Sequence, residues 1–123
     1  MTQRDFGQVF ERLRSVLSAQ AEGMEVVHDV PGNYHLDTRH VRDDGYVLMF
    51  AAVQTRASYV SYHLMPLYMH RELVDSMSAE LRRRMQGKSC LNFTRVDEDL
   101  ITELETVTAR AADIARSAAF LTG

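Results

Sequence analysis

The chain has 123 residues, of which 46% are hydrophobic and 25% charged, and its formal net charge at pH 7 is −3. This length fits one domain over residues 1–123, and the composition is typical of a globular chain rather than a disordered one. The slightly acidic balance argues against a general nucleic-acid partner.

Charged residues interrupt the N-terminal region, which therefore lacks the apolar stretch of a signal peptide. They are Arg4, Asp5, Glu11, Arg12 and Arg14. The longest apolar run covers residues 47–53 and is too short to span a bilayer. The single cysteine, Cys90, rules out an internal disulfide and suits a reducing compartment. We therefore expect a cytoplasmic protein with no membrane and no nucleic-acid partner.

The first half of the chain reads as one helix followed by strands. Apolar residues at helical spacing predict a helix from Thr2 to Glu22, with Thr2 and Asp5 resembling a capping box and Gly23 suited to its end. The apolar period then changes to two, which predicts strands at residues 24–30, 34–41, 46–53 and 57–64. In the fourth strand, two sets of alternating side chains should face opposite ways: Val60, Tyr62 and Leu64, and Tyr59, Ser61 and His63.

The strand at residues 46–53 is apolar at nearly every position, which predicts a central strand covered on both faces. If helices covered only one face, the other would expose a large apolar and aromatic surface. Helices, a bound ligand or a second subunit would have to cover that surface. A ligand pocket or a homo-oligomer is therefore expected unless the helices suffice.

In the second half, Pro66 ends the fourth strand and short helices follow. Their apolar residues are Leu73, Val74, Met77, Leu81 and Met85, with Ser78 as an N-cap and Gly87 as the end. A fifth strand is predicted at residues 89–93, and Asp97 should cap a last helix whose apolar stripe runs from Leu100 through Ala118 to Leu121. The fold class predicted is α+β: a mainly antiparallel twisted sheet of about five strands with an N-terminal helix and C-terminal helices packed on it.

Two short motifs suggest a family. Met65-Pro66-Leu67-Tyr68 follows the strand Tyr59-Val60-Ser61-Tyr62-His63, and Gly87-Lys88-Ser89-Cys90-Leu91-Asn92-Phe93 comes after the short helices. In this order, and over residues 46–104, the chain resembles the YdhG-like family, also called domain of unknown function 1801. The resemblance implies a compact α+β domain around a twisted antiparallel sheet, and it supplies no catalytic residues.

Some members of that family are described as frataxin-like iron chaperones, which implies metal (iron) binding or delivery as an alternative function. Proteins of that kind rely on a strongly acidic helix and an adjoining strand. Here the acidic residues of the first helix are offset by Arg4, Arg12 and Arg14. The chain departs from the iron-chaperone pattern at this point.

The polar aromatic chemistry is concentrated in the predicted sheet. All five histidines and all five tyrosines lie between positions 28 and 70. His35 and Asp37 share a strand face and could hold a divalent ion if further ligands joined them. Cys90 is the one candidate thiol nucleophile, with Lys88 close enough in sequence to activate it, but no histidine is predicted beside it.

We expect a non-enzymatic domain that binds a small molecule or an anion, or that self-associates, without a cofactor. The predicted ligand site consists of Tyr59, His63, Tyr68 and Lys88, with Arg84 joining Lys88 around an anionic group. Metal delivery through His35 and Asp37 is the second hypothesis. An enzyme that uses Cys90 or His63 is the third.

Overall fold

The computed structural model describes residues 6–117, and this part of the chain is an α+β structure. Its elements, in chain order, are α1 (Gly7–Ser18), β1 (Glu25–Val30), β2 (Asn33–Val41), β3 (Val47–Thr55), β4 (Val60–Leu64), α2 (Pro66–Met69), α3 (Arg71–Asp75), α4 (Ala79–Arg82), β5 (Met85–Gln86), β6 (Cys90–Phe93) and α5 (Glu98–Ala115). The predicted fold class is confirmed, with six strands in place of about five.

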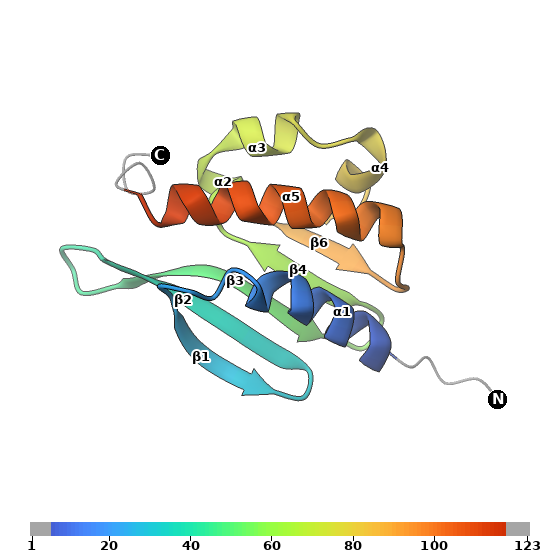
Figure 1. Ribbon diagram of the computed structural model, residues 1–123, viewed down its shortest axis with the longest axis horizontal. Coiled ribbons are helices and arrows are strands. Elements are labelled where there is room, and N and C mark those ends of the chain that lie inside the picture. The colour runs from blue at the N-terminus through green and yellow to red at the C-terminus, as the bar shows by residue number, and fades with distance from the viewer. Residues whose placement is uncertain (1–5, 118–123) are drawn as a thin grey trace.

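The strands form one antiparallel sheet in the order β1-β2-β3-β4-β6-β5. The two long helices, α1 and α5, lie next to each other across one face of this sheet, and α2 to α4 lie beside α5 (Figure 1). We call the opposite face, turned away from α1 and α5, the outer face. Among residues 6–117, no helix is both long and apolar enough to cross a membrane.

The core lies between the sheet and the long helices. Four residues that are successive cross-strand partners, Tyr34, Val53, Tyr62 and Leu91, are all buried there. The hydroxyl of Tyr62 forms a 2.8 Å hydrogen bond with that of Thr108 on α5, and burial raises the pKa of Tyr62. Val60, Tyr62 and Leu64 are fully buried whereas His63 is partly exposed, which confirms the predicted division of β4 into two faces.

β3 contains a bulge that changes the expectation of a strand covered on both faces. Leu36 pairs with Ala51, but the next residue, Asp37, pairs with Met49, so β3 carries one extra residue at Phe50. Such a bulge turns two consecutive side chains toward the same side, and Phe50 and Ala51 are both fully buried.

The middle of the outer face is therefore largely polar, unlike the large apolar surface expected. Its side chains on the strands next to β3 include His35, Ser61 and His63. β3 itself adds Ala52 and Gln54 at their partner positions. The argument that a large apolar surface needs a cover does not apply to this face.

The sixth strand arises where a helix end was predicted. α4 ends at Arg82, and Met85–Gln86 pairs with Leu91 and Cys90 as β5. Gly87 has φ +82°, which a residue with a side chain rarely adopts, so the glycine makes the tight turn between β5 and β6 instead of ending a helix.

The helix ends agree only partly with the sequence. α1 is shorter than the predicted 2–22, and the proposed cap residues Thr2 and Asp5 lie outside the described residues. Ser78 and Asp97 are N-caps as predicted, because their side chains accept hydrogen bonds from the backbone N–H of Leu81 and Leu100. On α5 the predicted stripe is buried at Leu100, Leu104, Val107 and Ala111, whereas Ala118 and Leu121 lie outside the described residues.

Candidate functional site

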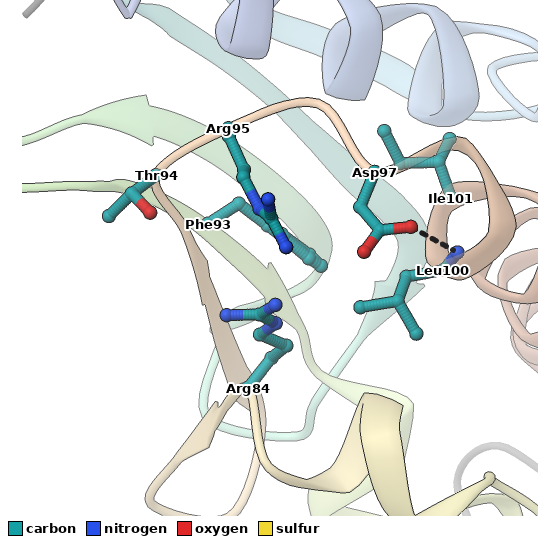
Figure 2. A pocket seen from close by; sticks show the side chains of 7 residues that line it. All are labelled: Arg84, Phe93, Thr94, Arg95, Asp97, Leu100 and Ile101. Atoms are coloured by element: carbon teal, nitrogen blue, oxygen red, sulfur yellow. Dashed lines mark hydrogen bonds between the residues drawn. The ribbon is translucent and has the colours of Figure 1, made fainter.

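A small pocket lies where β6 ends and α5 begins (Figure 2). It is lined by Arg84, Phe93, Thr94, Arg95, Asp97, Leu100 and Ile101. Arg84 comes from the segment between α4 and β5, and its carbonyl accepts a 2.8 Å hydrogen bond from the backbone N–H of Asn92. That bond anchors the backbone of Arg84 against β6.

Two guanidinium groups point into this pocket. Figure 2 shows the side chains of Arg84 and Arg95 directed into the same space from opposite sides. Across residues 6–117, neither guanidinium takes part in an ion pair or a side-chain hydrogen bond. Two like charges brought together repel each other, so an anion between them would be bound favourably.

The rest of the pocket wall is apolar apart from Thr94 and Asp97. Phe93, Leu100 and Ile101 are buried and provide an apolar floor. The carboxylate of Asp97 faces the pocket, and its Oδ1 accepts a 3.4 Å hydrogen bond from the N–H of Leu100 (Figure 2). With two arginines and one aspartate, the pocket carries a formal charge of about +1.

The structure separates Arg84 from Lys88, which the sequence analysis had placed together. They lie at opposite ends of the β5–β6 hairpin, because Arg84 adjoins Asn92 while Lys88 lies in the turn. Lys88 instead contacts Tyr68, with its Nζ 5.6 Å from the centre of the Tyr68 ring, and both side chains are exposed. Two residues of the predicted ligand site, Tyr68 and Lys88, therefore remain in contact with each other, but neither of them lines the pocket of Figure 2.

Tyr59 and His63 do not lie close together either. Tyr59 directly precedes β4 and His63 lies near its other end, and a separation of four residues corresponds to roughly 13 Å along a strand. Tyr59 lies in the turn after β3, whereas His63 lies next to β6. The predicted ligand site is therefore divided among several places, and only Arg84 belongs to the pocket of Figure 2.

In the sequence Arg95 belongs to the one basic cluster, together with residues 82–84 and Lys88, but sequence reasoning chose Lys88 rather than Arg95 as the partner of Arg84. The available signal was the position of Arg95 two residues before the Asp97 cap, which places it at the start of α5. Arg95 lies in the connection between β6 and α5, and Arg84 lies in the segment between α4 and β5. The sequence did not show that the fold would bring these two segments together.

The sequence did not predict a histidine beside Cys90, but the structure places one there. His63 and Cys90 are cross-strand partners on the outer face, and Nδ1 of His63 lies 2.9 Å from Sγ of Cys90. The hydroxyl of Ser89 lies 3.4 Å from the same nitrogen. Burial lowers the pKa of His63, and the charge of nearby His35 lowers it further.

His35 and Asp37, the candidate metal ligands, are bonded to each other. Nε2 of His35 lies 2.7 Å from Oδ1 of Asp37, and the rings of His28 and His35 meet edge to face with centres 5.8 Å apart. In the part of the chain that the structure describes, no three histidine, cysteine, aspartate or glutamate residues are grouped so as to hold a metal ion. This arrangement gives the iron hypothesis no support.

The fold and the pocket together define an α+β domain with helices on one sheet face and a small cationic pocket at the start of its last helix. Comparisons with protein-family models, with curated proteins and with solved structures found no match to this chain.

Proposed function

We propose that the chain is a non-enzymatic domain that binds a small anion between Arg84 and Arg95. The observation that carries this proposal is the convergence of two guanidinium groups on one pocket without a carboxylate partner of their own. Guanidinium groups bind carboxylates and phosphates with paired, charge-assisted hydrogen bonds, which are stronger than neutral ones. An anion at this position would also relieve the repulsion between the two arginines.

The pocket sets the size of the ligand. Its cavity volume is about 10 Å³, roughly the space of one water molecule. Pockets for drug-sized ligands have roughly 300–1,000 Å³, so this one suits only a single small anionic group. That group would lie between the arginines, over the apolar floor that Phe93 and Leu100 provide.

Isothermal titration calorimetry with inorganic phosphate and with acetate tests the proposal. We expect saturable binding of one of them, weakened roughly tenfold or more by Arg84→Gln or Arg95→Gln, because each change removes a charged hydrogen-bond donor. Tighter binding of acetate would identify a carboxylate ligand, and tighter binding of phosphate would identify a phosphate ligand.

The matched control is Arg82→Gln, which removes an exposed arginine of α4 outside the pocket. It should leave the affinity unchanged apart from a small loss of general attraction. Absence of binding by the unaltered chain, or equal losses in Arg82→Gln and Arg95→Gln, would overturn the proposal.

Self-association is a second candidate, favoured by the edge of the sheet. β1 is an edge strand, and no strand between residues 6 and 117 pairs with its outer side. All six of its residues are exposed, among them Val26, Val27 and Val30. An exposed apolar edge strand is a template for pairing with another chain, here a second copy. Sedimentation equilibrium over a range of concentrations measures whether a homodimer forms.

We also propose that the chain belongs to the YdhG-like family and that it is cytoplasmic. The family is supported by the two motifs, whose residues form the β4–α2 junction and the β5–β6 hairpin. The location is supported by the single free cysteine, which suits a reducing compartment.

A further inference from the structure

The outer face carries a nucleophile next to a base, at a distance from the anion pocket. Cys90 on β6 and His63 on β4 are direct cross-strand partners, and their reactive atoms, Sγ and Nδ1, are 2.9 Å apart. A thiol within hydrogen-bond reach of an imidazole is the usual arrangement of an activated cysteine. Cys90 itself is only partly buried.

The surroundings of His63 keep its ring neutral, with Nδ1 facing Cys90. Its Nε2 is buried and has no hydrogen-bond partner among the described residues, so Cys90 and Ser89 are the groups that engage the ring, both at Nδ1. The lowered pKa of His63 keeps its imidazole neutral near pH 7, and a neutral imidazole has a nitrogen free to take the thiol proton.

We propose that Cys90 and His63 form a reactive pair that exchanges with low-molecular-weight disulfides, which makes Cys90 a site of reversible mixed-disulfide formation. The proton of Cys90 passes to Nδ1 of His63 as the sulfur attacks one sulfur of the disulfide. The S–S bond of that molecule breaks, and the leaving thiolate takes the proton from His63. Cys90 is oxidised to the mixed disulfide, and the departing half is reduced to a free thiol.

An intramolecular disulfide is excluded as the oxidised form of Cys90. Cys90 is the single cysteine of the chain, so an intramolecular disulfide cannot form and the second sulfur must come from another molecule. The sulfur lies within the sheet between β4 and β5, which favours a small disulfide over the surface of a second protein. This inference concerns a different face from the anion pocket, and either can fail without the other.

The test is the rate at which the chain reacts with glutathione disulfide near neutral pH, followed as mass increase of the intact protein. The folded chain should react at least roughly tenfold faster than the same chain unfolded in urea, where Cys90 lacks His63. His63→Gln should lower the rate in the folded state by a similar factor. His28→Gln, which changes an exposed histidine of the same face, should leave the rate unchanged.

A folded chain that reacts no faster than the unfolded one would overturn the proposal, and this comparison needs no variant that has to fold. A folded His63→Gln variant that reacts as fast as the unaltered chain would also overturn it. A covalent dimer linked through Cys90 as the main product would overturn the assignment of a small disulfide as the reactant.

Discussion

The two nitrogens of His63 lie in different environments, and this difference has a consequence for stability. Nδ1 meets Cys90 and Ser89, while Nε2 is buried without a partner among the described residues. Protonation would place a charge at a buried position, and burial therefore lowers the pKa of His63 from its ordinary value of 6.5. The unfolded chain keeps the ordinary pKa and binds the proton more readily.

We therefore predict that the free energy of unfolding falls as the pH drops through about 6.5, and that His63 makes no such contribution above it. Urea unfolding of the unaltered chain at about pH 7.5 and pH 5.5 measures the loss. In His63→Gln the loss should be smaller, because this titrating group is gone, whereas His28→Gln should keep the full loss. Equal losses in the unaltered chain and in His63→Gln would contradict the prediction.

At the scale of residues, the sequence predicted alternation within a strand but not contacts between strands. The division of β4 into two faces, with Val60, Tyr62 and Leu64 on the core side, followed from the period of two. The contact of His63 with Cys90 depends on the β4–β6 register, and that of Arg84 with the start of α5 depends on the β5–β6 hairpin. No local pattern determines either register, so both contacts had to come from the structure.

At the scale of elements, β3 is central to the sheet and Phe50 is its most sensitive position. Phe50 is fully buried at the bulge, with its backbone carbonyl accepting a hydrogen bond from the N–H of Met65. Phe50→Asp would place an unpaired carboxylate in the core, at a cost of several kcal/mol against a total stability of about 5–15 kcal/mol. We predict that this variant does not fold cooperatively.

Thermal unfolding followed by circular dichroism measures the effect. Val47→Asp in the same strand is the matched control, and because Val47 is exposed its stability should change by only about 0.5 kcal/mol. A cooperative unfolding transition of Phe50→Asp close to that of the unaltered chain would show that Phe50 does not support the core.

The elements that the sequence predicted best were those with a clear period and a cap. Asp97 and the apolar spacing after it placed the start of α5 correctly, and the alternation after Gly23 placed β1 and β2 to within a residue or two. β5 was missed because two residues are too few to show a period. Met85, half-buried beside β6, also matched the spacing of the preceding helices.

At the scale of the whole molecule, the order of helix, strands and helices was enough to predict the α+β class. It was not enough to show which surfaces remain exposed. Among residues 6–117, the large apolar side chains that are exposed, apart from Tyr68, lie on β1 and around the β2–β3 connection: Val26, Val27, Val30, Val41, Tyr46 and Val47. Any dimer of this chain should therefore form on the β1 side of the sheet.

We predict that Val27→Lys prevents this dimer, because lysine on an edge strand opposes pairing with a second edge. Sedimentation equilibrium should then give the monomer mass at concentrations where the unaltered chain is dimeric. Tyr68→Lys, which removes an exposed ring far along the sheet order from β1, should leave the dimer intact. A monomer mass for the unaltered chain at every concentration would rule out self-association.

The bulge in β3 also bears on how chains of this kind can diverge. On one side of Phe50 the strand alternates in step with β4, and on the other side its alternation is shifted by one residue. Loss of the codon for Phe50 would remove only the extra residue: Ala51 would stay opposite Leu36 and Met49 opposite Asp37, so residues 47–49 and 51–55 would keep their present faces. A descendant could in this way return β3 to a regular alternation through a change in length, and the cost would fall on the core, which would lose the buried ring of Phe50.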